Sequence, residues 1–139
     1  MSKYPLPSGL HNSTLAVRVA VERSQYGENS EALYLSTGFV QPDATASAAR
    51  FGGEEEGYTY GRSGNPTVTA FEQRLAAMEG AEACMATASG MAAIMLMCFS
   101  LLKAGDHVVF SQSMFGSTIK LIGTEFDVWF HHQAHRHRV

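Results

Sequence analysis

Residues 83–110 read ACMATASGMAAIMLMCFSLLKAGDHVVF, and this stretch decides the fold. A short apolar run at 83–87 precedes a longer one at 90–103, and the turn sequence Ala-Gly-Asp separates the longer run from 107–110. The pattern predicts a strand, a helix and a second strand. Two strands joined by a helix are most simply neighbours in one parallel sheet with a right-handed crossover. The sequence therefore predicts an α/β fold.

Ser89 and Gly90 lie where the first predicted strand ends and the helix begins. Open α/β sheets bind ligands at such a place. A helix N-terminus also offers an anion free N–H groups and the positive end of the helix dipole. We expect Ser89, Gly90 and Met91 to donate backbone N–H groups to a phosphate, because glycine leaves room for close approach. An ordinary Ser-Gly helix start is the alternative interpretation.

A second motif, YTYGRSGNPT at 58–67, joins a cation to a strong helix start. Asn65 as N-cap and Pro66 at the first helical position predict a helix. Just before it, Arg62 offers a planar charged fork that suits phosphate, and the hydroxyl of Tyr60 lies two residues away. The loop is therefore a candidate anion site. A surface arginine stacked on a tyrosine is the alternative.

Helical patterns cover much of the remaining chain. Ser13 is predicted to cap a helix over 14–24, and Asp43 to cap a short alanine-rich helix that ends near Gly52 and Gly53. Two further helices are predicted, each with one apolar face: Val68, Phe71, Leu75 and Met78 in a helix that Gly80 closes, and Ile119, Ile122 and Phe126 in a helix over 113–126.

Bulk composition narrows the function classes. Hydrophobic residues make up 45% and charged residues 17%, as in core-forming globular proteins. The net charge of −3 argues against a nucleic-acid-binding surface. The N-terminus has no apolar segment of signal-peptide length, and the longest apolar run, 91–102, is too short to cross a bilayer. We therefore expect a cytoplasmic protein in which Cys84 and Cys98 are buried thiols.

The last residues, 129–139, hold four of the six histidines. Imidazoles bind transition metals, but no carboxylate or cysteine accompanies them in this stretch. We predict no metal site and interpret 127–139 as an atypical terminus, of the kind that a frame shift or an early stop produces. The chain is thereby divided into an N-terminal arm with the candidate anion-binding loop (1–60), the opening of a larger domain (61–126) and that terminus.

Three ordered motifs resemble one family of enzymes. They are Tyr60-x-Arg62-x-x-Asn65-Pro66-Thr67, ASGMAA at 88–93 and QSMFGST at 112–118. They are similar to the signature, the phosphate-binding turn and the ring-stacking segment of the pyridoxal phosphate (PLP) enzymes of cysteine and methionine metabolism. The resemblance extends from about Leu33 to Phe126. Within the family the chain is most similar to the O-succinylhomoserine sulfhydrylases, notably in having Phe115 where many relatives have tyrosine.

The resemblance implies a fold, a cofactor and a set of contacts. The fold is an N-terminal arm followed by the first part of a PLP-dependent, aspartate-aminotransferase-like (fold type I) large domain. The cofactor is pyridoxal 5'-phosphate, held in a site shared between subunits of a homo-oligomer. Its phosphate is gripped by the loop of one subunit and the helix start of another, and an aromatic ring stacks on its pyridine. The implied cofactor-binding residues are Tyr60, Arg62, Ser89, Gly90, Met91 and Phe115.

The resemblance also implies a reaction. The substrates are an O-acylhomoserine, here O-succinylhomoserine, and sulfide, and the product is homocysteine for methionine biosynthesis. Cystathionine γ-synthase or γ-lyase activity is an alternative, and a non-catalytic fragment or interaction module is another. The lysines are Lys3, Lys103 and Lys120, and none has the sequence context of the lysine that carries the cofactor in this family. We therefore expect no catalytic residue in this chain and no activity from it alone.

Overall fold

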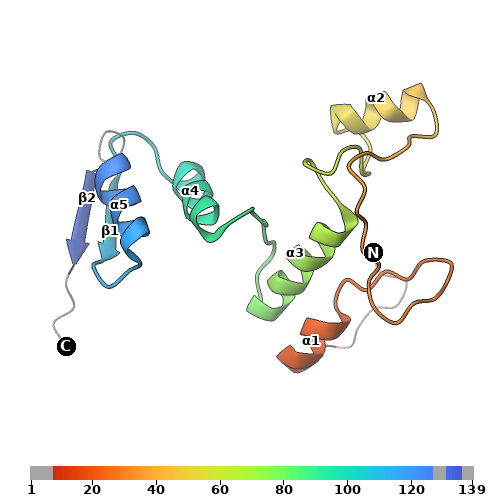
Figure 1. Cartoon of the computed structure of the whole chain (residues 1–139), viewed down its shortest axis with the longest axis horizontal. Coiled ribbons are helices and arrows are strands. Elements are labelled where there is room, and N and C mark those ends of the chain that lie inside the picture. Colours follow the sequence, from red (N-terminus) through yellow and green to blue (C-terminus); the bar gives the residue numbers. More distant parts are fainter. Residues whose placement is uncertain (1–7, 127–130, 136–139) are drawn as a thin grey trace. The chain divides into compact units, whose positions relative to one another are not determined.

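The computed structural model describes residues 8–126 and, as backbone only, residues 131–135. Figure 1 shows the elements in chain order. The chain forms two compact units, Met1–Ala86 (unit 1) and Thr87–Val139 (unit 2). This boundary differs from the sequence-based division after residues 60 and 126.

The longest helix of unit 1 begins and ends where the sequence predicts. Helix α3 spans Pro66–Glu79, and the Oδ1 atom of its N-cap, Asn65, accepts the N–H of Thr67 at 2.8 Å. Gly80 ends the helix with φ 64°, a left-handed conformation that favours glycine. Local capping chemistry therefore decides both boundaries.

The alanine-rich helix is also confirmed. Helix α2 spans Ala44–Gly52, and the Asp43 carboxylate caps it by accepting the N–H of Ala46 at 2.8 Å. Gly53 follows with φ 77°. The helix carries Arg50, whose guanidinium pairs with the carboxylate of Glu55 at 2.7 Å just beyond the C-cap.

The first helix is shorter than predicted. Helix α1 spans Asn12–Arg18, with His11 and not Ser13 as its N-cap. It stops before residue 24 because the Val19 carbonyl accepts two N–H groups of Arg74, at 3.1 and 3.2 Å, and Ala20 takes a left-handed φ of 59°. A long-range contact ends this helix, and the local pattern did not contain that information.

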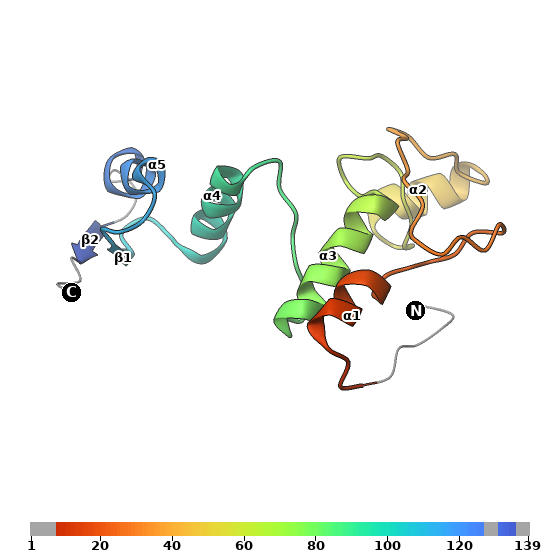
Figure 2. The same ribbon diagram turned by 60° about the horizontal axis from the view of Figure 1, so that its bottom comes forward.

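Helices α1 and α3 lie side by side in unit 1, as both views show (Figure 1 and Figure 2). The face of α3 differs from the prediction. Of the predicted face, Leu75 and Met78 are half-buried, whereas Val68 and Phe71 are 42% and 56% exposed, and the buried residues are Ala70 and Ala76. Polar contacts account for this difference, because α3 binds the segment 31–34 through Thr67 and Arg74.

Unit 2 contains a helix followed by a parallel pair of strands. Its first helix, α4, spans Gly90–Leu101, and strand β1 spans His107–Ser111. The chain then forms α5 (Gly116–Lys120), the π-helix η1 (Leu121–Glu125) and strand β2 (His131–His135). Strands β1 and β2 pair in parallel, with His107 opposite His131.

The first predicted strand, at 83–87, is wrong. These residues are not in a strand, and no described strand pairs with them. A strand needs a neighbour for its backbone groups, and the Ala86 N–H instead donates to the Glu72 carboxylate at 2.7 Å. The observed crossover is β1–α5–η1–β2, so β2 lies inside the segment that the sequence analysis interpreted as an atypical terminus.

The core of unit 2 is small. Cys98 of α4 and Phe126 are 2% and 5% exposed, and partly buried apolar side chains surround them: Ile94, Leu102, Val108 and Leu121. Ile122 is 4% exposed, so the inward positions of Ile122 and Phe126 are confirmed. Burial raises the pKa of the Cys98 thiol, and the other cysteine, Cys84, is half-buried.

Helix α4 is less covered than its apolar sequence predicts. Side chains along most of its length are exposed: Met95, Leu96, Met97, Phe99 and Leu101. Within unit 2, α4 is covered mainly at Cys98, which belongs to one cluster with Phe126 and with Leu121 of η1. None of the helices in the described part of the chain has the length and apolar character of a membrane span.

Candidate cofactor-binding site

The loop with the candidate cation is tied to the extended segment before α2. Gly38 and Tyr60 form an isolated antiparallel bridge. The Gly61 N–H donates to the Thr37 carbonyl at 2.7 Å, and the Phe39 N–H donates to the Thr59 carbonyl at 3.2 Å. These bonds fix the backbone at the residue that immediately precedes Arg62.

Gly61 is required by a close approach of two backbones. A Cβ atom at this position would lie 3.3 Å from the Ser36 carbonyl oxygen and 3.4 Å from that of Thr37. Contacts this tight would push the loop away from the segment that holds it. The sequence Tyr60-Gly61-Arg62 therefore needs glycine at its centre for packing, not for an unusual φ.

Arg62 lies over the ring of Tyr60, with 5.5 Å between the guanidinium carbon and the ring centroid. Both side chains are exposed, Tyr60 at 42%. Within residues 8–126 the Arg62 guanidinium has no carboxylate partner. The structure therefore presents a charged fork, stacked on an aromatic ring, that is open to an anion from outside unit 1.

The start of α4 is the second predicted part of the site. The Ser89 Oγ accepts the N–H of Ala92 at 3.2 Å, and Thr87 Oγ1 donates to the Ser89 carbonyl at 2.8 Å. The N–H groups of Gly90 and Met91 have no acceptor among the described residues. A Cβ at Gly90 would meet nothing within 4 Å. This helix start is capped, open, and retains free donors.

Phe115 is the third predicted part. It immediately precedes α5, and its side chain is 76% exposed, so it is not part of the core of unit 2. Thr118, three residues later, is buried, and its hydroxyl lies 3.8 Å from the Met91 sulfur. This contact brings the starts of α4 and α5 together within unit 2.

The sequence matches the family of Cys/Met metabolism PLP-dependent enzymes over residues 13–135. The chain belongs to this family. The match continues to residue 135, so the prediction that the resemblance ends at Phe126 is wrong. The family prediction and its cofactor class are thereby confirmed.

Relatives with assigned activities are similar over most of this chain. An O-succinylhomoserine sulfhydrylase of Pseudomonas aeruginosa is 51% identical over 117 residues, which are 84% of this chain and 28% of that protein. One from Mycobacterium tuberculosis is 47% identical over 112 residues, 81% of this chain and 28% of that protein. An L-methionine gamma-lyase of Fusobacterium nucleatum is 40% identical over 109 residues, 78% and 28% of the two chains. The chain thus matches little more than a quarter of their length.

Solved structures confirm the fold. A putative O-acetylhomoserine (thiol)-lyase of Campylobacter jejuni, which contains N'-pyridoxyl-lysine-5'-monophosphate, superposes with a TM-score of 0.84 at 30% identity over 92% of this chain and 32% of that one. A cystathionine gamma synthase of Xanthomonas oryzae gives 0.79 at 28% identity, over 95% and 33%. The chain therefore has part of the PLP-dependent, fold type I architecture.

The residues of this family member fit the cofactor chemically. Free N–H donors at Gly90 and Met91 suit a phosphate, and the exposed ring of Phe115 suits an aromatic ring of a ligand. Within unit 2, the Met91 side chain contacts Thr118, which lies three residues after Phe115. Arg62, stacked on the Tyr60 ring, is the candidate anion-binding group of unit 1.

Sequence reasoning missed the polar anchors of this family member. Arg74 donates to the Glu31 carboxylate at 2.7 Å, and this hydrogen bond lowers the pKa of Glu31 to about 2. The partners are 43 residues apart, and no local pattern connects them. The contact of Glu72 with the Ala86 N–H was missed for the same reason.

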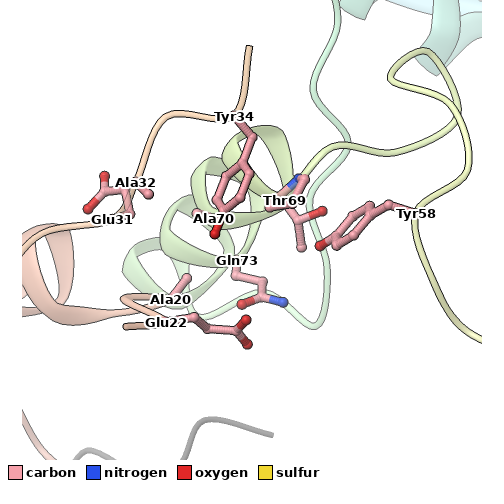
Figure 3. A pocket seen from close by; sticks show the side chains of 10 residues that line it. Ala20, Glu22, Glu31, Ala32, Tyr34, Tyr58, Thr69, Ala70 and Gln73 are labelled. Carbon is pink, nitrogen blue, oxygen red and sulfur yellow. The ribbon is translucent and has the colours of Figure 1, made fainter. Parts of the chain in front are cut away.

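A small cavity in unit 1 was also not predicted. It has a volume of about 80 Å³, and Figure 3 shows the hydroxyls, carboxylates and amide around it. Its walls are formed by Ala20, Glu22, Glu31, Ala32, Tyr34, Tyr58, Pro66, Thr69, Ala70 and Gln73. It includes none of the predicted cofactor residues. Among residues with described side chains, no cluster of metal-binding groups occurs, and the histidines of 129–139 lie outside them.

Proposed function

We propose that this chain is part of a PLP-dependent O-succinylhomoserine sulfhydrylase, which makes homocysteine from O-succinylhomoserine and sulfide in methionine biosynthesis. The observation that carries the proposal is its identity of 51% and 47% with two such sulfhydrylases, against 40% with a γ-lyase. The open helix start and the exposed guanidinium support it, because both suit the phosphate of the family's cofactor.

Each part of the site has a separate task in this proposal. Ser89, Gly90 and Met91 hold the phosphate with backbone N–H groups, and Arg62 with Tyr60 binds it from the other side. Phe115 lies on the ring and sets its tilt. When bound, PLP supplies electron withdrawal from the substrate, which lets its protons and its γ-substituent leave.

Phe115 has a consequence for proton transfer. Its ring has no hydroxyl, so it neither donates nor accepts a proton. Succinate leaves as a carboxylate and needs no proton, so any other proton transfer that a tyrosine hydroxyl would perform falls to another group or to water. This distinguishes the proposed site from those of family members with tyrosine at the position.

We further propose that the loop of one protomer serves the site of a neighbour in a homo-oligomer. The exposure of Arg62, with no carboxylate partner in the described part of unit 1, supports this arrangement.

A cytoplasmic location fits Cys84 and Cys98, which are both free thiols.

The lysine that bears the cofactor is, in this proposal, not one of the described lysines. Lys103 lies in the turn after α4, and Lys120 is largely exposed, 4.0 Å from the Glu125 carboxylate. Borohydride reduction of the purified 139-residue chain with PLP, followed by peptide mass spectrometry, tests this. We expect no preferred pyridoxyl-lysine at either position, and stoichiometric labelling of one of them would contradict the proposal.

A grafted enzyme tests the activity itself. The matching segment of the Pseudomonas aeruginosa sulfhydrylase is replaced by this chain, and homocysteine formation from O-succinylhomoserine and sulfide is measured. We expect activity that depends on added PLP. In the Arg62→Ala control, the PLP concentration for half-maximal activity should rise roughly tenfold or more, as expected for loss of a charge-assisted contact. An inactive, folded graft would count against the proposal.

A γ-lyase is the second candidate, and the 40% identity to a methionine γ-lyase favours it. The same chain is grafted in parallel into the Fusobacterium nucleatum enzyme, and methionine cleavage without sulfide is measured. The sulfhydrylase proposal requires that a larger fraction of host activity survives in the sulfhydrylase host. The reverse ranking would support the lyase.

A further inference from the structure

Asn65 does more than cap α3. Its side chain is 8% exposed, and both of its polar atoms are engaged. Oδ1 accepts the Thr67 N–H at 2.8 Å, while Nδ2 donates to the carbonyls of Tyr34 at 2.9 Å and Ser36 at 3.4 Å. The helix start is thereby attached to a segment about 30 residues earlier in the chain.

Thr67 makes a matching attachment. Its Oγ1 accepts the N–H of Tyr34 at 2.8 Å. Asn65 and Thr67 thus bond the carbonyl and the N–H of the same residue. The extended segment from Tyr34 to Ser36 is fixed to the first turn of α3 by side chains, in place of a strand partner.

The same segment continues directly into the contacts that hold the Arg62 loop. The next residue, Thr37, accepts the Gly61 N–H, and Gly38 bridges to Tyr60. The bonds form a closed ring, from Asn65 to the segment, from the segment to Gly61, and along the chain back to Asn65. Arg62 lies inside this short ring, so its backbone has few conformations to lose on binding an anion.

We infer that Asn65 and Thr67 are positioning residues for Arg62 and Tyr60. They clamp segment 34–38 so that the loop is preorganised for the anion, and they do not touch the ligand themselves. The inference rests on the proposed function, because it assumes that Arg62 binds the cofactor phosphate. It differs from a helix-capping role, which would stabilise α3 and leave anion affinity unchanged.

Two matched substitutions at Thr67 separate these roles. Thr67→Val keeps the shape and the N–H that Asn65 accepts, but it removes the hydroxyl acceptor for Tyr34. Thr67→Ser keeps that hydroxyl. In the grafted holoenzyme we expect Thr67→Val to weaken PLP binding roughly five- to tenfold, about the value of one hydrogen bond, and Thr67→Ser to restore most of the affinity.

Asn65→Asp provides an independent variant. The aspartate keeps the cap for α3 but loses the Nδ2 donor to the Tyr34 and Ser36 carbonyls. We expect PLP affinity to fall while the helix remains intact by amide exchange. An unchanged affinity in both Asn65→Asp and Thr67→Val would overturn the inference.

A double-mutant cycle with Arg62→Ala distinguishes positioning from general stability. If Thr67 acts through Arg62, Thr67→Val should cost little further affinity once Arg62 is absent. An equal loss in both backgrounds would overturn the positioning role and leave the proposed function standing. No effect of Arg62→Ala alone would overturn the proposed phosphate contact, and the positioning role with it.

Amide hydrogen exchange in the 139-residue chain provides a test that needs no host enzyme. The Gly61 N–H, bonded to Thr37, should exchange several-fold faster in Thr67→Val than in Thr67→Ser, while amides in the middle of α3 stay unchanged. Equal exchange at Gly61 in the two variants would contradict the clamp even where a graft fails to assemble.

Discussion

The two units hold their parts of the candidate site in different ways. In unit 1, side chains of α3 fix the Arg62 loop through polar contacts with residues far away in the sequence. In unit 2, the candidate phosphate-binding turn at the start of α4 is fixed by its own helix cap, and a small apolar core around Cys98 holds that helix. The stability of the Arg62 loop therefore depends on a network of polar contacts, whereas that of the helix start at Ser89 depends on a few buried side chains.

The substitution with the largest expected effect destabilises unit 2. Phe126→Ala removes one of the most buried side chains of a core with few members and should cost about 3 kcal/mol of unfolding free energy. The measurement is amide exchange in β1. Phe99→Ala is the control, because Phe99 touches Phe126 at 5.2 Å between centroids but is 58% exposed. Equal losses in the two variants would contradict the core described above.

A substitution with a smaller expected effect destabilises unit 1. Arg74→Ala removes the contacts with the Val19 carbonyl and the Glu31 carboxylate, and should cost about 2 kcal/mol. Denaturant unfolding monitored by amide exchange in α3 measures it. Arg50→Ala is the matched control, since its pair with the more exposed Glu55 and its bond to Gln41 span only five and nine residues and should contribute less than the contacts of Arg74. A larger loss at Arg50 would reverse our ranking of these pairs.

Acid should weaken unit 1 through Glu31. The hydrogen bond from Arg74 lowers the pKa of Glu31 from 4.5 to about 2. The carboxylate therefore stabilises the fold fully above pH 4.5, and this contribution is lost as the pH falls toward 2. Amide exchange in α1 and α3 across this range measures the loss. In Glu31→Gln this part of the pH dependence should disappear, and a persisting slope would assign it to other carboxylates.

The smallest effect sharpens the contrast between stability and binding in unit 2. Ser89→Ala removes the cap of α4 and should cost about 1 kcal/mol of helix stability. Ser89→Asp restores the cap but places a negative charge where we propose a phosphate. The alanine variant should therefore lose stability, and the aspartate variant should lose PLP affinity in the grafted enzyme. Equal PLP affinity in wild type and Ser89→Asp would count against a phosphate at this turn.

Most features that depend on neighbouring residues were predictable from the sequence, although the N-cap of α1 is His11 and not Ser13. Asn65 with Pro66 gave the start of α3, Asp43 that of α2, and Ser89 that of α4, because a cap involves only the next three residues. Strand β1 followed from its run of apolar and β-branched residues. The motif residues also led to the correct family.

Features that depend on distant partners were not predictable. Residues 83–87 are a short apolar run of the length of a strand, but no described strand pairs with them. The end of α1 is decided by Arg74, and the face of α3 by its bonds to Glu31 and Tyr34. Segment 131–135 has a histidine-rich composition that hides its strand, which exists because β1 offers it a parallel edge.

The exposure of Arg62 has a practical consequence for the choice of buffer. A charge in open solvent is screened over about 10 Å at 0.1 M ionic strength, and inorganic phosphate or sulfate competes for the same guanidinium. Affinities for phosphorylated ligands measured in phosphate-buffered saline would therefore underestimate what this loop contributes. Dilute amine or zwitterionic buffers are the appropriate medium.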